Sequence, residues 1–135
     1  MKKISVIATA LIVVAGAAYA EGDAAKGEKD FKKCKSCHMI ANADDVIVKG
    51  GKTGPNLYGI VGRPAGDQPD YKYSKAMLEA RDAGLIWTEE NLNKYIQDPK
   101  TFLRETLGDS SAKAKMTFKL KKPQDVVAYL ASVQQ

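Results

Sequence analysis

Cys34-Lys35-Ser36-Cys37-His38 is the stretch that decides how the rest of this 135-residue sequence is read. Two cysteines separated by two residues, with a histidine directly after the second, form the attachment signature of c-type haem. Each thiol adds across one vinyl group of the porphyrin, which makes two thioether bonds on neighbouring edges of the ring. The imidazole of His38 is then held over one face, where it can reach the iron. The motif therefore predicts one covalently attached haem c, with Cys34 and Cys37 as its anchors and His38 as an axial ligand.

Two other kinds of site use the same residues. A dithiol redox motif or a simple disulfide uses both cysteines without the histidine, and a dithiol motif lies near a βαβ unit, which this sequence lacks. Cys34, Cys37 and the only histidine of the chain would supply three zinc ligands, whereas structural zinc normally takes four. Haem attachment is the preferred interpretation, and a haem-free module held by a disulfide remains the alternative.

The N-terminus has the pattern of a secretory signal peptide. A positive segment ends at Lys3, an apolar stretch runs from Ile4 to Val14, and Ala18 and Ala20 are small residues where signal peptidase reads them. We therefore predict cleavage after Ala20. An uncleaved membrane anchor is the alternative, but the uncharged run is short for a full span and contains a glycine.

Cleavage would remove residues 1–20 and leave residues 21–135 as one domain in the periplasm, without stable membrane insertion. Loss of Lys2 and Lys3 lowers the formal net charge from +5 to +3. A chain this mildly basic is not expected to bind nucleic acid. Nothing in the pattern indicates self-association, so a monomer is expected.

The mature sequence predicts an all-α domain of helices and long loops. Asp23, Ser74 and Thr88 are suitable N-cap residues for helices that start after them, the first running to about Cys34. Pro99 opens a further helix and Pro123 stands near the start of the last one. Strand signals are too few for a sheet.

Residues 40–66 read as a long loop, in which Val46-Ile47-Val48 could form a brief extended piece. Gly50-Gly51 and Gly54-Pro55 are turn signals. A loop of this length inside a compact domain commonly wraps around something. We expect the haem to supply the part of the core that these residues do not.

The residue at the sixth position of the iron decides the chemistry. A methionine thioether stabilises ferrous iron and makes an electron carrier, whereas an open position suits peroxide chemistry or gas binding. Met39 adjoins His38 and cannot reach the opposite face of the same iron. Met77 lies on an amphipathic helix and reads as a core residue. Met116 stands among lysines without an obvious packing role, so we predict Met116 as the second axial ligand.

In its haem motif and in the position of Met116, the chain resembles the class I c-type cytochromes, most closely the large subtype of bacterial cytochrome c2. The resemblance covers essentially residues 22–132 and implies a small cytochrome c fold, wrapped around one haem. The matching positions, in family order, are Gly27, Phe31, the Cys34-to-His38 motif, Lys52 to Leu57, Gly62-Arg63, Tyr71, Tyr73, Trp87, Tyr95, Pro99, Lys115-Met116, Phe118 and Tyr129. Cytochrome c′ does not fit, because its haem motif lies near the C-terminus.

The resemblance also implies roles around the haem. The Pro55 carbonyl would accept a hydrogen bond from the second ring nitrogen of His38. Tyr95 would lie near the Met116 sulfur. Buried propionates would need donors, because an uncompensated buried charge is costly. The donors that the resemblance implies are Arg63, Tyr73 and Trp87.

Two features depart from the family pattern. Ala114 stands where the family often has threonine, which puts one propionate hydrogen bond in doubt. The chain also looks longer around Asn42–Gly51 and Arg104–Lys113. These insertions should be surface loops, and the second one, directly before Met116, could loosen the sulfur ligand.

The function that the resemblance implies is a one-electron carrier, not an enzyme. Its electron donor would be a cytochrome bc1 complex, and its acceptor a photosynthetic reaction centre or a terminal cytochrome oxidase. A haem peroxidase or a gas-binding protein with an open sixth position is the competing interpretation.

Lysines gather on both sides of the haem motif and around Met116. They are either two solvated lysine-rich stretches or a positive ring that steers an acidic partner to the haem edge. The predicted docking residues are Lys33, Lys35, Lys52, Lys113, Lys115, Lys119 and Lys121.

Overall fold

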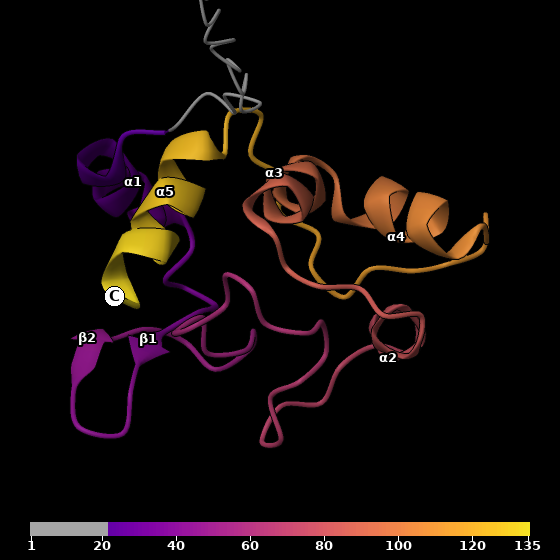
Figure 1. Ribbon diagram of the computed structural model, residues 1–135, viewed down its shortest axis with the longest axis horizontal. Helices are drawn as coiled ribbons and strands as arrows, with labels where there is room; N and C mark the ends of the chain where they lie inside the picture. The colour runs from indigo at the N-terminus through magenta and orange to yellow at the C-terminus, as the bar shows by residue number, and fades with distance from the viewer. Residues whose placement is uncertain (1–21) are drawn as a thin grey trace, which may run out of the picture.

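The computed structural model describes residues 22–135, so the predicted signal peptide of residues 1–20 and its cleavage site lie outside the described residues. The elements, in chain order, are α1 (Ala24–Asp30), the 3-10 turn η1 (Phe31–Lys33), β1 (Ile40–Ala41), β2 (Val46–Val48), α2 (Lys75–Asp82), α3 (Glu89–Gln97), α4 (Pro99–Leu107) and α5 (Gln124–Val133) (Figure 1). The mainly helical fold predicted from the sequence is confirmed. No helix among these is long and apolar enough to cross a bilayer.

Side-chain caps set the starts of the helices. Asp23 accepts hydrogen bonds from the backbone of α1, and Ser74, Thr88 and Asp98 do the same for α2, α3 and α4. Each cap satisfies a backbone N–H that has no partner inside its helix. The first helix is shorter than predicted, because the chain tightens into η1 after Asp30 and the Cys34 N–H bonds to the Phe31 carbonyl at 2.8 Å.

Helices α1 and α5 cross in close contact, side by side in Figure 1. A Cβ atom built on Gly27 would collide with the backbone carbonyl of Asp125, so only glycine allows this approach. One turn further on, the rings of Phe31 and Tyr129 pack with centroids 5.8 Å apart. The crossing explains a glycine that would otherwise weaken a short helix.

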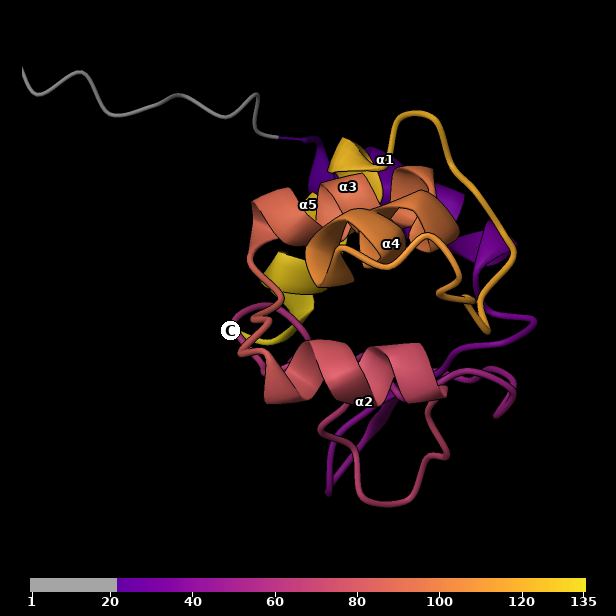
Figure 2. The same ribbon diagram turned by 90° about the vertical axis from the view of Figure 1, so that its right-hand side faces the viewer.

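Helix α4 links the other two helices, α2 and α3, and α3 also packs against α5. Helix α4 packs against both α2 and α3, and Figure 2 shows α2 on the opposite side of the molecule from α1, α3 and α5. Trp87, Tyr95 and Phe102 hold α3 and α4 together, with Trp87 and Tyr95 ring centroids 4.9 Å apart and Tyr95 and Phe102 centroids 5.9 Å apart. Leu103 on α4 is fully buried.

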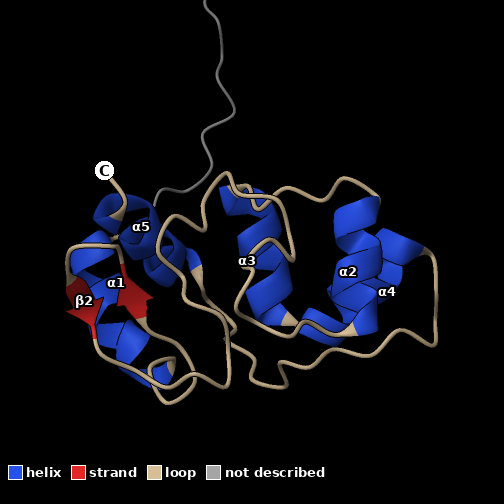
Figure 3. Ribbon diagram, turned by 90° about the horizontal axis from the view of Figure 1, so that it is seen from below, coloured by secondary structure: helices blue, strands red, loops and turns tan. Residues whose placement is uncertain are grey.

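The expectation of no sheet is wrong at one place, where residues 40–48 form a hairpin (Figure 3). Strand β1 pairs antiparallel with β2, with Ile40 opposite Val48 and Ala41 opposite Val46. The Asn42 side chain accepts hydrogen bonds from the backbone N–H groups of Asp44 and Asp45, at 2.9 and 2.8 Å, and closes the turn. The β-branched run at 46–48 then favours extended backbone. The turn made by Asn42 is the signal that the sequence reading did not weigh.

The α1–α5 crossing makes one stability prediction. Gly27→Ala should lower the free energy of unfolding by about 1–3 kcal/mol, the usual cost of overpacking, although alanine alone favours a helix by about 1 kcal/mol. Chemical denaturation of the haem-loaded protein measures this. Lys26→Ala, on the exposed side of the same helix, is the control and should have little effect. A Gly27→Ala protein as stable as the parent would contradict the tight crossing.

Candidate functional site

A cavity of about 370 Å³ is lined by residues of η1, α2, α3, α5 and the loops between them, and its wall is mainly apolar. Its lining comes from segments far apart in the sequence: 31–38, 53–60, 71–77, 87–96, 115–118 and 126–130. The main apolar contributors are Phe31, Ile60, Leu92, Ile96, Val126 and Leu130. A ligand with a large apolar surface fits such a site.

The cavity brings together eight of the site residues predicted from the sequence. They are Cys34, Cys37, His38, Pro55, Tyr73, Trp87, Tyr95 and Met116. Of the predicted docking lysines, Lys33 and Lys115 also line it. Arg63 does not line the cavity, and neither do Lys35, Lys52, Lys113, Lys119 and Lys121. Within residues 22–135 no three His, Cys, Asp or Glu side chains gather as a zinc site would require.

His38 is held by a hydrogen bond from its ring. Its Nδ1 lies 2.8 Å from the Pro55 carbonyl oxygen. A carbonyl can only accept, so Nδ1 is the protonated nitrogen and Nε2 keeps its lone pair. Burial lowers the pKa of His38, and the Pro55 bond offsets this in part. The neutral imidazole is the form that binds a metal.

Gly54 makes room for that ring. A Cβ atom on Gly54 would lie 2.7 Å from Nδ1 and 2.8 Å from Nε2 of His38, which no side chain could tolerate. The Gly54 N–H also bonds to the Cys37 carbonyl at 2.8 Å, which ties the loop to the motif. The sequence reading treated Gly54 only as a turn signal, and its pairing with the motif histidine was missed.

Cys34 and Cys37 are free thiols in a tight turn, where the N–H groups of Cys37 and His38 both bond to the Cys34 carbonyl, at 3.1 and 3.0 Å. Burial raises the pKa of the Cys34 thiol to about 11, and the nearby Asp30 charge acts in the same direction. Thiol–disulfide exchange needs a thiolate, which this environment disfavours. Burial therefore disfavours the reactive form of the Cys34 thiol, whereas Cys37 is exposed.

Met116 lies on an irregular segment that is anchored on both sides. The Lys115 ammonium donates to the Lys72 carbonyl at 2.6 Å and sits 4.7 Å from the centre of the Tyr71 ring. Further along, the Leu120 N–H donates to the Ile96 carbonyl at 3.0 Å. These contacts give the segment a defined path without a helix.

The insertion before Met116 differs from the surface loop that was expected. Residues 104–107 complete α4, and α4 ends at Gly108 in a left-handed conformation with φ +60°. The Arg104 side chain then donates to the Ala112 carbonyl at 3.0 Å, and Ala112 is buried. Part of this segment is therefore helix, and the irregular residues after Gly108 are hydrogen-bonded back to that helix through Arg104.

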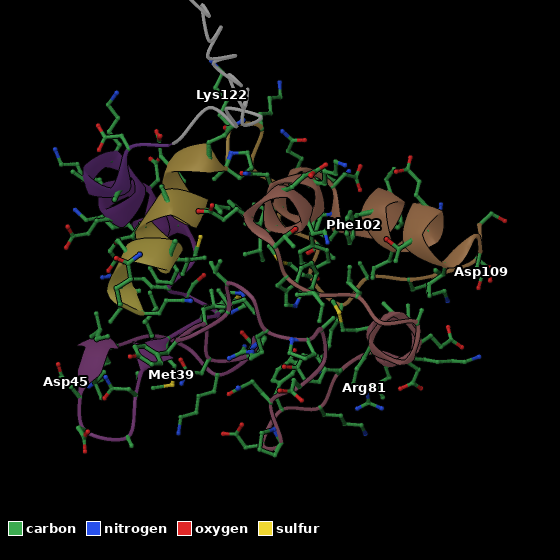
Figure 4. The ribbon with its side chains drawn as sticks, in the orientation of Figure 1. Met39, Asp45, Arg81, Phe102, Asp109 and Lys122 are labelled. Carbon is green, nitrogen blue, oxygen red and sulfur yellow. The ribbon has the colours of Figure 1, made fainter. Side chains whose placement is uncertain are left out.

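The methionines take different positions. Met39 lies beside β1 and does not line the cavity (Figure 4). Met77, on α2, is 7% exposed, belongs to the core as predicted, and also lines the cavity. Met77 and Met116 therefore share the cavity.

Arg63 and Tyr73 carry polar groups with spare hydrogen-bonding capacity. Arg63 donates to the carbonyls of Tyr58 and Asn56 at 2.9 and 3.2 Å, while its Nε is buried and has no partner among the described residues. The Tyr73 hydroxyl accepts from the Gln68 N–H at 3.1 Å and keeps its own proton to donate. Buried donors without partners are rare, and a carboxylate would satisfy them.

These observations fit a haem. The cavity offers an apolar wall, two thiols on one segment, an oriented imidazole and thioether sulfurs. The unpaired Nε–H of Arg63, outside this lining, is a further donor that a carboxylate would satisfy. Burial also raises the pKa of Tyr95, so its hydroxyl stays neutral near these groups.

Three of the predicted docking lysines form ion pairs or hydrogen bonds within the chain. Lys33 lies 3.7 Å from Asp30, Lys115 bonds as described above, and Lys119 pairs with Asp98 at 2.8 Å. The other four are exposed, and the structure shows no ion pair for them among the described residues: Lys35, Lys52, Lys113 and Lys121.

The chain is similar to bacterial cytochromes along nearly its whole length. It is 54% identical to cytochrome c2 of Rhodobacter capsulatus, over 97% of this chain and 98% of that protein. It is 58% identical to cytochrome c-550 of Paracoccus pantotrophus, over 82% and 86% of the two chains. The structure of ferric cytochrome c-550 from Paracoccus versutus superposes with a TM-score of 0.82 at 55% identity, covering 85% of this chain and all of that one. No family model matches.

The contact between Asp98 and Lys119 predicts a pH dependence. The Lys119 hydrogen bond and the Thr101 N–H lower the Asp98 pKa from 3.8 to about 2. A carboxyl group whose pKa is lower in the folded state adds stability above its unfolded pKa, and this contribution is lost as pH falls towards the folded value. Asp98→Asn keeps a capping oxygen but loses the charge, so its melting temperature should be lower than that of the parent at neutral pH.

The difference in melting temperature should shrink as pH falls from about 4 towards 2. Thermal scans of both proteins across this range measure it. Asp70→Asn, at an exposed loop position, is the matched control and should give no such trend. An Asp98→Asn deficit that persists unchanged at the lowest pH would contradict the ionic contribution.

Proposed function

Because the chain belongs to the cytochrome c2 family of haem-containing electron carriers and is therefore an electron-transfer protein rather than an enzyme, we propose that it is a monohaem c-type cytochrome of the periplasm, with the haem held covalently. The observation that carries the proposal is the convergence of Cys34, Cys37, His38 and Met116 on one apolar cavity. Residues 1–20 would direct export and be removed.

The residues of the site have separate roles. Cys34 and Cys37 would hold the haem through thioether bonds, and His38 and Met116 would be the axial ligands. When bound, the haem supplies a one-electron couple between Fe(III) and Fe(II). The Pro55 carbonyl, 2.8 Å from Nδ1, fixes the tautomer and orientation of the His38 ring and strengthens it as a ligand.

The apolar lining and the Met116 thioether act together on the potential. A neutral sulfur ligand favours the ferrous state, and burial among Phe31, Leu92 and Leu130 disfavours the extra charge of the ferric state. If His38 and Met116 both held the iron, the chain would leave no position for a substrate. Electron transfer without product formation is the activity that this arrangement supports.

The polar residues would stabilise the charged edge of the haem. Arg63 would donate through its unpaired Nε, and Tyr73 through the hydroxyl proton that the Gln68 N–H leaves free. Trp87 would be a further donor, and Tyr95 would lie near the Met116 sulfur. These roles come from the family resemblance and are supported by the burial of Trp87, the partial burial of the other three residues and the unsatisfied Arg63 nitrogen.

The partners would be a cytochrome bc1 complex as donor and a photosynthetic reaction centre or a terminal oxidase as acceptor. Lys33 and Lys115 line the cavity, and exposed lysines stand near both in the sequence. Positive charge around the cavity would speed encounter with an acidic partner, in a salt-dependent way. A small contact would also let the complex dissociate quickly.

The axial assignment is tested with the two methionines that line the cavity. Ferric haem with thioether ligation shows a weak far-red absorption band. Met116→Ala should lose this band and lower the reduction potential, because the sulfur ligand is gone. Met77→Ala should retain the band, at some cost in stability, since Met77 is a buried core residue.

Optical spectra and redox titrations of the exported, haem-loaded proteins measure both effects. Loss of the band in Met77→Ala, with the band intact in Met116→Ala, would show that the assignment is wrong. Retention of the band in both variants would exclude a methionine ligand from this cavity.

The lysine proposal is tested by charge reversal at two exposed positions without ion pairs. Lys35→Glu combined with Lys113→Glu should slow association with an acidic redox partner by about tenfold or more at low salt. The rates of parent and variant should converge at high salt, because screening removes the long-range attraction. Stopped-flow kinetics over a range of ionic strength gives both.

The control combines Lys29→Glu with Lys100→Glu, exposed lysines on α1 and α4 outside both predicted groups. It changes the net charge by the same amount. Equal slowing by the control pair would show that total charge matters and that the lysines near the cavity have no special role.

A further inference from the structure

The end of the chain holds a loop of the cavity wall through one side chain. The Gln134 amide oxygen accepts from the Val61 N–H at 3.2 Å, and its Nε2 donates to the Val61 carbonyl at 3.0 Å. One side chain therefore pairs with both backbone groups of a residue 73 positions earlier in the sequence. In the part of the chain that the structure describes, these are the hydrogen bonds that join residues 57–65 to α5 and the residues after it. In Figure 1 the C-terminal end of α5 points towards the hairpin and the loops that follow it.

The stretch that Gln134 holds is flanked by two glycines with left-handed backbone. Gly59 and Gly62 have φ +74° and +88°, and a Cβ atom built on either would meet nothing within 4 Å. Their backbone is therefore what requires glycine, the residue with the most conformational freedom. Ile60, between them, is buried and lines the cavity. The clamp on Val61 restrains this part of the wall at its centre.

The Val61–Gly62 peptide carries the restraint on to Trp87. Its carbonyl accepts from Gln134, and its N–H donates to the Trp87 carbonyl at 2.7 Å. The Trp87 N–H in turn donates to the Arg63 carbonyl at 2.9 Å. Hydrogen bonds in such a chain polarise and strengthen one another. Gln134 is therefore connected, bond by bond, to the short backbone pairing that carries Arg63 and Trp87.

The Arg63 side chain is oriented by the same loop. Its guanidinium donates to the carbonyls of Tyr58 and Asn56, while its buried Nε has no partner among the described residues. Val61 lies between Tyr58 and Arg63 in the sequence. The Gln134 clamp therefore acts inside the loop that brings the guanidinium to these carbonyls.

We infer that Gln134 is a positioning residue of the haem site, which holds Val61 and thereby keeps Arg63 and Trp87 placed to donate to the haem carboxylates. This role rests on the proposed function, in which Arg63 and Trp87 are donors to those carboxylates. The family resemblance covers residues 22–132 and gives Gln134 no role. The assignment comes from the two hydrogen bonds of its side chain and from the residues that they hold.

A positioning role for Gln134 predicts a change in how the reduction potential depends on pH. An ionised carboxylate near the iron stabilises the ferric state and lowers the potential, and its protonation as pH falls raises the potential. A cationic donor keeps the pKa of such a carboxylate low. A less well-placed Arg63 would let this pKa rise, so the potential would begin to rise at a higher pH.

The other ionisable groups near the site are the same in the parent and in every variant at Gln134. Asp67 and Tyr73 act electrostatically on Arg63, and burial raises the pKa of Tyr73 so that it stays neutral. The ionisable residues that line the cavity are Lys33, Cys34, Cys37, His38, Tyr71, Tyr73, Tyr95 and Lys115.

Gln134→Met keeps the length of the side chain and removes both hydrogen bonds. In the haem-loaded protein the midpoint of the pH dependence should move up by about half a pH unit, a part of the roughly 1–3 units that an adjacent arginine contributes. Redox titrations over a series of pH values measure it. Gln135→Met, at the exposed next residue, is the matched control and should leave the midpoint unchanged. An unmoved midpoint in Gln134→Met, or an equal shift in Gln135→Met, would overturn the proposal.

Amide hydrogen exchange tests the clamp itself. The Val61 N–H should exchange about tenfold faster in Gln134→Met, because it loses its acceptor. The Phe102 N–H, which donates to the Asp98 carbonyl at 3.0 Å, should keep its rate. An unchanged Val61 rate, or equal acceleration at both positions through a general loss of stability, would count against the positioning role. If Gln134→Met does not accumulate, Gln134→Asn takes its place, because its amide is one methylene too short to pair with both groups.

A double variant tests whether Gln134 acts through Arg63. Arg63→Gln should raise the midpoint further than Gln134→Met, and the two changes together should shift it by less than the sum of the single shifts. Additive shifts would exclude action through Arg63. Failure of the proposed function has a different signature, because the parent protein itself would then carry no covalent haem.

Discussion

The enclosure of one apolar cavity by segments that are distant in the sequence is the constraint on which the structure depends. The segments that carry Cys34, Pro55, Tyr73, Trp87 and Met116 all line this space. A domain of this size has little core to spare. The segments that line this space therefore depend on what fills it, although α3 also packs directly against α5. A covalently held porphyrin would complete the core and perform the redox chemistry at once.

The same constraint explains why irregular segments carry much of the site. Residues 49–74 and 109–123 contain no helix or strand, yet they are tied at defined points: Gly54 to Cys37, Lys115 to Lys72, and Lys119 to Asp98. Loops position ligands well when their ends and their backbone groups are fixed. Lysine-rich composition around Met116 is therefore compatible with order, because two of those lysines form the anchoring contacts.

The chemical part of the site could be predicted from the sequence because it lies in short motifs. The Cys34-to-His38 spacing predicts two bonds and one ligand without reference to the fold, and cap residues such as Ser74 and Thr88 mark helix starts locally. Contacts between residues far apart in the sequence are harder to predict from it. The packing of Gly54 against the His38 ring depends on residues more than ten positions apart in the sequence. The same is true of the hydrogen bonds between the Asn56 side chain and the Ala41 backbone in β1.

Two local features were also misread. The sequence predicts a brief extended piece at Val46–Val48 but not its pairing with Ile40–Ala41, because the Asn42 turn and a bulge at Ile47 interrupt the alternation that marks strands. A surface loop is predicted for Arg104–Lys113, but residues 104–107 continue α4 and the Arg104 side chain bonds to the Ala112 carbonyl. In both cases a single polar side chain determines the outcome, and composition does not reveal which backbone group it will meet.

The measurement that tests the central claim most directly is the intact mass of the exported protein under denaturing conditions. The account predicts the mass of residues 21–135 plus one haem, because thioether bonds at Cys34 and Cys37 survive unfolding. A mass equal to that of the polypeptide alone would contradict a covalently completed core.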